Sequence, residues 1–139
     1  MIAYLDSSVL LRVILGQRNA VKEWRDIEQG VASALVEVEC LRTLDRLRLN
    51  ERLSDEVIAL RREAVFRLLE SMEILDLTSP ILTRASQPLP TALGTLDAIH
   101  LATALLWREG RQENLVMATH DTSLALAARA NGFHVVGTP

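Results

Sequence analysis

Cysteine is almost absent from this chain of 139 residues, and Cys40 is its only example. One cysteine cannot form a disulfide within the chain, and it cannot supply the several thiolates of a structural zinc site. Cys40 lies in a helical pattern, where a free cysteine usually behaves as a small apolar core residue. The scarcity of cysteine favours a reducing compartment, so we expect a cytoplasmic protein.

Long hydrophobic runs are absent as well. The longest candidate, at residues 101–107, falls far short of the roughly 20 apolar residues that a membrane-spanning helix needs. The first residues carry no basic segment ahead of their short apolar stretch, which is interrupted by Asp6. The sequence therefore predicts neither a spanning helix nor a signal peptide.

Lysine is nearly missing, although positive charge is not. Fifteen basic residues oppose eighteen acidic ones to give a net charge of −3, and Lys22 is the only basic residue that is not an arginine. A protein that binds nucleic acid mainly through its charge usually carries a basic patch or stripe. The composition shows no such excess, so any contact with RNA depends on a local arrangement. The arginines between residues 42 and 67 form either a local basic face or separate solvated charges.

What the chain does contain is an alternation of short apolar segments with helical patterns. Apolar residues make up 49% of the sequence, which is enough for one core. The expected strands cover residues 2–5, 31–34, 72–77, 115–118 and 134–136. The expected helices cover residues 9–15, 20–29, 35–49, 55–71, 95–108 and 122–130, with a short helix beginning at Ser79 and Pro80.

These elements predict one architecture. Uniformly apolar strands separated by helices imply a parallel sheet that is covered on both faces, because parallel pairing requires crossover connections. We therefore expect an α/β fold, a three-layer α/β/α sandwich. No internal repeat, low-complexity tract or linker divides the chain, so residues 1–139 are expected to form a single domain. Gly30 is expected to end the helix over 20–29 as its C-terminal cap.

Three acidic residues stand at positions where functional side chains often lie in folds of this kind. In open parallel sheets the ligand crevice lies beyond the carboxyl ends of the strands. Asp6 follows the first expected strand and Asp121 follows the fourth, while Asp97 stands in the first turn of an otherwise apolar helix. Each of them alone is also explained as an acid at a helix N-terminus, which contributes a few tenths to about 1 kcal/mol.

Taken together, the acids point to a metal ion. Carboxylates that converge in one crevice repel one another and raise each other's pKa unless a cation neutralises them. Oxygen ligands suit Mg²⁺ or Mn²⁺, and the chain offers only three histidines and one cysteine for a softer metal. An oxygen-ligated ion beside a phosphodiester can activate a water and stabilise the leaving oxygen. Either one or two ions would serve this chemistry.

Four blocks of sequence carry a resemblance to a known family. They read YLDSSVL at residues 4–10, SALVEVECLR at 33–42, LDAIHLATA at 96–104, and ATHD at 118–121 followed by Leu124 and Ala127-Ala128. In this order and spacing they resemble the four acidic blocks of PIN-domain ribonucleases, and among these the toxins of the VapC type. The resemblance spans nearly the entire chain, and the third block is its most specific part.

The resemblance implies a fold and an activity. It implies a five-stranded parallel sheet in the order 3-2-1-4-5 and a Mg²⁺- or Mn²⁺-dependent endoribonuclease that hydrolyses RNA. Carried over by position, the metal-site carboxylates are Asp6, Glu39, Asp97 and Asp121. It also implies the toxin role of a type II toxin-antitoxin pair, with a VapB-like antitoxin covering the active site, and a homodimer.

The second block contains two candidate acids. Glu37 and Glu39 are two residues apart on a helix, so they point to nearly opposite sides and only one can face the site. Helical periodicity does not choose between them, whereas the spacing in the family from Ser33 and to Arg42 favours Glu39. Arg42 either helps to hold the site or an RNA phosphate, or is a surface arginine.

Further candidates flank the acids. Ser7 and Thr119 stand where similar proteins place hydroxyls that bond the ligands or a metal-bound water, and local turn bonding is the equal alternative. His100 is expected to be a packed histidine with its ring satisfied rather than a ligand. His120 replaces the aromatic or polar residue expected at its position, and a catalytic role for it is only a hypothesis.

Two other classes of function fit this sequence less well. A PIN-like fold without catalysis would act as a binding module, but an intact set of four acids argues against a degenerate site. Haloacid-dehalogenase-like phosphatases need a second Asp two residues after the first, where this chain has Ser8. Receiver domains need a lysine late in the fold, and Lys22 is the only lysine. Both phosphotransfer families fit poorly.

Overall fold

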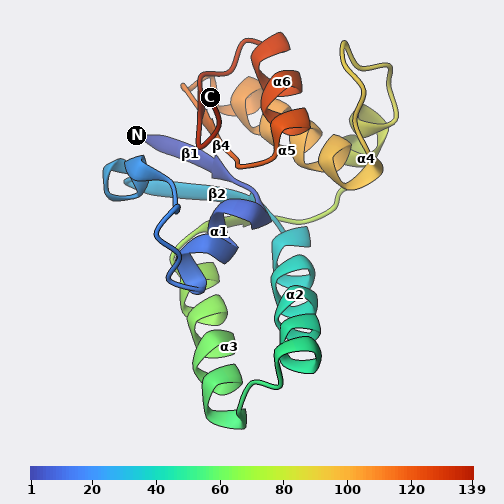
Figure 1. Ribbon diagram of the computed structural model, residues 1–139. Coiled ribbons are helices and arrows are strands. Elements are labelled where there is room, and N and C mark those ends of the chain that lie inside the picture. The colour runs from blue at the N-terminus through green and yellow to red at the C-terminus, as the bar shows by residue number, and fades with distance from the viewer.

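A single parallel sheet forms the centre of the computed structural model, which describes residues 1–139 (Figure 1). Its strands are β1 (Ile2–Leu5), β2 (Gln29–Ser33), β3 (Glu73–Leu75), β4 (Val116–Ala118) and β5 (Val135–Val136). They lie in the order β3-β2-β1-β4-β5, and every neighbouring pair is parallel. The strand order implied by the family resemblance is confirmed.

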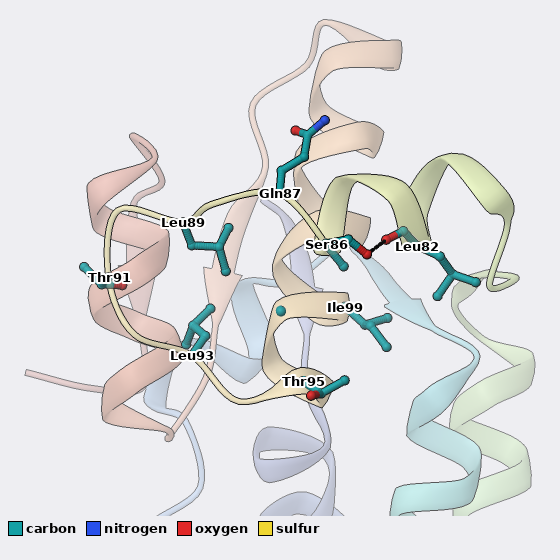
Figure 2. Close-up of a pocket in the computed structure, with 10 residues that line it drawn as sticks. Leu82, Ser86, Gln87, Leu89, Thr91, Leu93, Thr95 and Ile99 are labelled. Atoms are coloured by element: carbon teal, nitrogen blue, oxygen red, sulfur yellow. Dashed lines mark hydrogen bonds between the residues drawn. The ribbon is translucent and has the colours of Figure 1, made fainter.

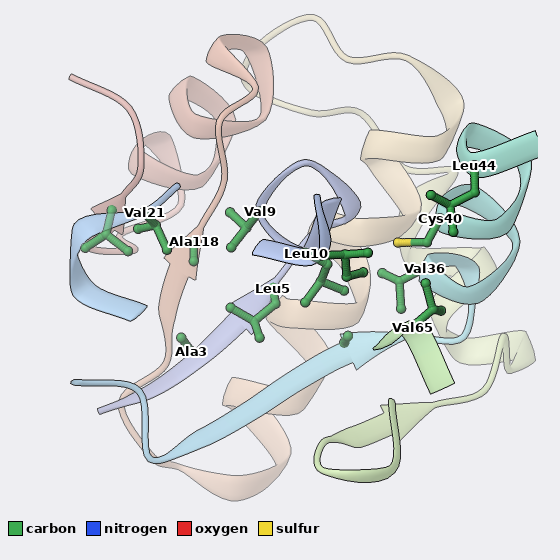
Figure 3. Packing of buried hydrophobic residues seen from close by; sticks show 13 residues of the cluster. Ala3, Leu5, Val9, Leu10, Val21, Val36, Cys40, Leu44, Val65 and Ala118 are labelled. Carbon is green, nitrogen blue, oxygen red and sulfur yellow. The ribbon is translucent and has the colours of Figure 1, made fainter. Parts of the chain in front are cut away.

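Helices cover both faces of the sheet. They are α1 (Ser7–Ile14), α2 (Leu35–Glu51), α3 (Asp55–Glu70), α4 (Ser79–Ala85), α5 (Thr95–Arg111) and α6 (Thr122–Ala130). One core cluster joins Ala3 and Leu5 of β1 to α1, α2 and α3, as Figure 3 shows. The other joins Tyr4 of β1 to α5 and α6. Because successive side chains of a strand point to opposite faces, these contacts define three layers and confirm the α/β/α sandwich.

The helices α2 and α3 form a hairpin that extends away from the sheet (Figure 1). Arg52 closes the end of α2 in the left-handed conformation, with φ of 51°. The hairpin leaves large apolar side chains in solvent, among them Val38, Leu49 and Leu60, which are 61%, 62% and 65% exposed. Its base belongs to the core, where Cys40 and Leu44 are buried.

Cys40 is the core residue that the sequence predicts. Its side chain is buried and free of any disulfide. Burial, together with the neighbouring charges of Glu39 and Asp6, raises the pKa of the Cys40 thiol to about 12. The thiol therefore stays protonated at neutral pH and is not a nucleophile.

The segment 20–29 differs from the expected helix. Only Lys22–Asp26 is helical, as a short 3-10 turn, and β2 already begins at Gln29. Gly30 is a strand residue paired with Ala3, not a helix cap, and it lacks the positive φ that such a cap adopts. A Cβ at Gly30 would lie 2.9 Å from the Leu5 side chain and 3.0 Å from that of Met72, so a larger residue here would displace these two side chains. The prediction that Gly30 ends a helix is therefore wrong, because Gly30 lies within β2.

No helix of this fold combines the length and the apolar character that crossing a membrane requires.

Candidate active site

Asp6 stands directly after β1, at the carboxyl edge of the sheet, and caps the N-terminus of α1. Its Oδ1 accepts hydrogen bonds from the Ser8 hydroxyl at 2.6 Å and from the backbone N–H of Val9 at 3.2 Å. Its Oδ2 accepts from the Thr119 hydroxyl. Burial raises the pKa of Asp6, and these three hydrogen bonds oppose that rise. These hydrogen bonds hold the carboxylate in one orientation. Only 4% of the residue is exposed.

The segments that follow β1 and β4 are joined through two hydroxyls. The Ser8 hydroxyl accepts from the backbone N–H of His120 at 2.9 Å, and the Thr119 hydroxyl accepts from that of Asp121 at 3.0 Å. Both hydroxyls also donate to Asp6. Since β1 and β4 are parallel neighbours, their carboxyl ends meet at this edge. The two strand-end acids therefore share one small hydrogen-bonded network.

This network partly matches the sequence expectations. Thr119 bonds an acid as predicted, but the hydroxyl that bonds Asp6 after β1 belongs to Ser8 and not to Ser7. Two serines follow Asp6 in the sequence, and no sequence signal chooses Ser8 over Ser7 as its partner. Asp121 itself caps α6, its Oδ1 accepting from the backbone N–H of Leu124 at 2.8 Å.

Asp97 lies in the first turn of α5 and is partly buried. Burial raises the pKa of Asp97, and the negative charge of Asp121 raises it next. Asp6 and Glu39 add smaller increases, while His100 acts in the opposite direction. Each of the three other acids thus raises the pKa of Asp97, and these acids stand at the ends of β1 and β4 and on α2.

Glu39 reaches this region from α2. Its Oε1 lies 2.7 Å from Nε2 of His100, whose Nδ1 lies 2.7 Å from the Tyr4 hydroxyl. Glu37 is exposed and has no such contact. The structure therefore brings Glu39, and not Glu37, toward the other acids. Both ring nitrogens of His100 have partners, which confirms the expectation of a packed and satisfied histidine.

The side chains of His120 and Arg42 make their contacts away from the four acids. Nδ1 of His120 is 2.8 Å from the carbonyl oxygen of Gly137, so the ring is tied to the segment after β5. Arg42 is 63% exposed and pairs with Asp45 on its own helix. Neither side chain bonds one of the four acids. For Arg42 the structure agrees with the alternative of a surface arginine.

The donor set of the site suits a hard divalent cation. All four acids offer carboxylate oxygens, which are the ligands that such ions prefer. The negative charges of the other acids raise the pKa of Asp97, and a bound cation would offset this repulsion. No group of three ligating side chains is already close enough to hold an ion. The chemistry of these oxygen donors fits Mg²⁺ or Mn²⁺, whereas their spacing in this structure does not form a coordination shell.

A cavity of about 520 Å³ lies beside the site, between α4, the loop that follows it and the start of α5 (Figure 2). Leu82, Leu89 and Leu93 contribute apolar surface to its wall. Thr95, Ala98 and Ile99 of α5 complete it, so the cavity shares a helix turn with Asp97. None of the four acids lines it. The cavity is a neighbour of the acidic region and not part of it.

Comparisons with known proteins agree with this description. Residues 3–130 match the PIN domain family. The chain is 28% identical over 137 residues to Ribonuclease VapC47 of Mycobacterium tuberculosis (strain CDC 1551 / Oshkosh), covering 94% of this chain and 92% of the relative.

Solved structures share the fold. A toxin-antitoxin complex from Klebsiella pneumoniae has a chain that superposes with a TM-score of 0.67 at 20% identity, covering 99% of this chain and 95% of that one. VapBC2 from Rickettsia felis bound to a DNA fragment from their promoter gives 0.67 at 12% identity, with 97% of both chains covered. At these identities the structures support the three-layer architecture.

Proposed function

This chain belongs to the PIN domain family, and from that premise we propose that it is a Mg²⁺- or Mn²⁺-dependent endoribonuclease, the toxin of a type II toxin-antitoxin pair. The observation that carries the proposal is the grouping of Asp6, Glu39, Asp97 and Asp121 at the carboxyl edge of the sheet, where Asp97 feels the other three charges. The name of the VapC47 relative supports a ribonuclease. Structural neighbours that are toxin-antitoxin complexes support the toxin role.

In this proposal the four carboxylates hold the divalent ion. When bound, such an ion lowers the pKa of a water and stabilises charge on the leaving oxygen of a phosphodiester. The protein supplies the orientation of the ligands. Ser8, Thr119 and the N–H of Val9 fix Asp6, and the N–H of Leu124 fixes Asp121.

Charge explains why a cation must precede the substrate. The site presents up to four negative groups, and RNA is itself a polyanion, so the bare site repels a phosphodiester. Neutralising the acids with a divalent cation removes that repulsion and at the same time reverses the destabilising effect on Asp97. The acidic net charge of −3 is therefore compatible with an RNA substrate.

Partners follow from the same proposal. We infer that residues 1–139 act as one domain in the cytoplasm, as a homodimer whose site is covered by a VapB-like antitoxin in the resting complex. The complexes among the structural neighbours, including FitAB bound to IR36 DNA fragment, support an antitoxin partner. Exposed Val38 and Leu60 on the α2–α3 hairpin offer apolar surface that a protein partner would cover.

Cleavage of RNA by the purified protein is the direct test. Protein freed of antitoxin under denaturing conditions and refolded should cut RNA with Mg²⁺ or Mn²⁺ and stop when EDTA is added. Asp97→Asn, prepared identically, should retain the fold by circular dichroism and lose cleavage. A parent protein that cuts no RNA with either ion would refute the proposal, and so would an Asp97→Asn variant as growth-inhibiting as the parent. The second result would favour a binding module.

A further inference from the structure

A buried chain of polar groups ties Glu39 to the centre of the sheet. Tyr4 of β1, His100 of α5 and Glu39 of α2 are linked by two contacts of 2.7 Å. The members are 96 and 61 positions apart in the sequence. Tyr4 is 0% exposed and His100 is 1% exposed, while the Glu39 side chain is 21% exposed. The chain therefore starts in the core and ends at the acidic region.

The direction of the hydrogen bonds follows from the tyrosine. A tyrosine hydroxyl carries its proton at neutral pH, because its ordinary pKa is about 10, so it can donate to the ring nitrogen 2.7 Å away. In a neutral ring, a Tyr4 hydroxyl that donates to Nδ1 leaves the proton of His100 on Nε2, where it donates to Glu39. The ring also meets the Tyr4 ring edge-on, with centroids 5.9 Å apart and planes at 70°. Contacts on both nitrogens and on the ring leave His100 a single orientation.

Glu39 needs such support more than the strand-end acids do. Asp6 and Asp121 have short side chains that are locked by hydrogen bonds from backbone N–H groups next to them. Glu39 has a longer side chain on a helix whose far half extends from the body of the fold, and its carboxylate has one polar partner, His100. A freely rotating glutamate would spend much of its time in solvent.

We propose that His100, itself held by Tyr4, is a positioning residue that fixes Oε1 of Glu39 and leaves Oε2 directed to the metal site. This inference rests on the proposed function, because it assigns Glu39 to the ion. Hydrogen bonds that orient a metal ligand typically change affinity by about 10–100-fold when they are removed. Glu37, on the opposite side of α2, makes no such contact.

Tyr4→Phe tests the inference because it removes one oxygen and keeps the ring. Titration calorimetry of antitoxin-free protein with Mn²⁺ should show an affinity about tenfold weaker than that of the parent. In a Glu39→Gln background, Tyr4→Phe should change the affinity no further. The matched control is Trp107→Phe, which also deletes a hydrogen bond of α5, the partly buried one to Glu73 of β3. That variant should lose stability and keep the parent affinity for Mn²⁺.

His100 variants supply a rescue experiment. Glutamine carries an N–H at about the reach of Nε2, so His100→Gln should retain most of the Mn²⁺ affinity, whereas His100→Leu should lose it. Nitrogen-15 NMR of the His100 ring should show the proton on Nε2 in the parent. In Tyr4→Phe the ring should populate both tautomers, because Nδ1 no longer receives a hydrogen bond.

The outcomes separate the two proposals. A parent chain that binds no Mn²⁺ overturns the proposed function and this inference with it. A parent that binds Mn²⁺ while Tyr4→Phe binds it equally well overturns the inference alone. Equal losses of affinity from Tyr4→Phe with and without Glu39 would also overturn it, because they would show a general structural effect. The same holds if His100→Gln falls to the level of His100→Leu.

Discussion

Thr119 donates its hydroxyl hydrogen to Oδ2 of Asp6, although 113 positions separate the two residues in the sequence. The same hydroxyl accepts from the backbone N–H of Asp121 at 3.0 Å. Thr119 is fully buried, so neither contact is exchanged with water. A single hydroxyl thus fixes the first and the last acid of the site relative to each other.

Thr119→Val should disturb both acids at once. Valine keeps the shape but leaves Oδ2 of Asp6 and the N–H of Asp121 without this partner, so we expect a loss of about 1–3 kcal/mol in the free energy of unfolding. Cleavage of RNA should fall by about tenfold or more. Urea denaturation and a cleavage assay measure the two effects. Thr43→Val is the control, because the Thr43 hydroxyl bonds only within α2, and it should leave cleavage intact.

Asp97→Asn should stabilise the fold at neutral pH while it abolishes cleavage. Burial, and then the charge of Asp121, raises the pKa of Asp97 in the folded protein. The protonated carboxyl therefore stabilises the fold fully below the ordinary pKa of aspartate, and this stabilisation is lost as the pH rises through the raised pKa. Asparagine removes that penalty. The gain in melting temperature over the parent should be present at pH 7 and should vanish in the acid range, below the ordinary pKa of about 3.9.

Asp45→Asn should change the melting temperature in the opposite direction. The hydrogen bond and charge of Arg48 lower the pKa of Asp45, with Arg42 assisting, so its contribution is present above the ordinary pKa and is lost as the pH falls through the folded value. This variant should melt slightly below the parent at pH 7, and the difference should close at low pH. If Asp97→Asn and Asp45→Asn shifted the melting temperature in the same direction at pH 7, the electrostatic account of the site would be wrong.

Divalent cations should stabilise the parent protein against unfolding. An ion that binds only the folded chain adds about 2.7 kcal/mol at one hundred times its dissociation constant. Thermal melts with Mg²⁺ or Mn²⁺ should therefore rise with ion concentration and fall back when EDTA is added. Sodium chloride at matched ionic strength controls for screening. Asp6→Asn combined with Asp97→Asn should remove the dependence on divalent ions, and a persistent dependence would place the ion elsewhere.

Two glycines should respond to alanine in opposite ways. At Gly30 the new Cβ would lie 2.9 Å from Leu5 and 3.0 Å from Met72, so Gly30→Ala should cost about 1–3 kcal/mol through overpacking. At Gly110, within α5, a Cβ meets nothing within 4 Å, and alanine should stabilise the helix by up to about 1 kcal/mol. Chemical denaturation of both variants measures the contrast. A neutral Gly30→Ala would show that β2 has room for a side chain.

The elements that the sequence predicted well are those whose signals are local. The apolar run before Asp6 and the apolar face of α5 were sufficient to place a strand and a helix near their observed bounds. The segment 20–29 was misjudged, because charges at helical spacing around Trp24 indicated a helix where the chain makes a short 3-10 turn. The pairing of β2 with β1 then extends the strand back to Gln29. Long-range pairing outweighed the local pattern.

The assignment of the four acids remains a prediction, and its support differs from residue to residue. Asp6 and Asp121 follow strands, which a sequence can indicate. The preference for Glu39 over Glu37 came from family spacing, and the structure adds the contact with His100. No single-sequence signal links Glu39, His100 and Tyr4, because their contacts depend on how α2 and α5 cross the edge of the sheet.

The contact between Asp6 and Thr119 also determines how late in synthesis the site can form. Ribosomes add about 5–20 residues per second, so the 113 positions between Asp6 and Thr119 correspond to on the order of ten seconds of synthesis. During that interval the nascent chain has Asp6 but neither Thr119 nor Asp121. A chain interrupted before Thr119 lacks the hydroxyl that links Asp6 to Asp121. Translation itself therefore delays the moment at which the acids that we propose to bind the ion can be brought together.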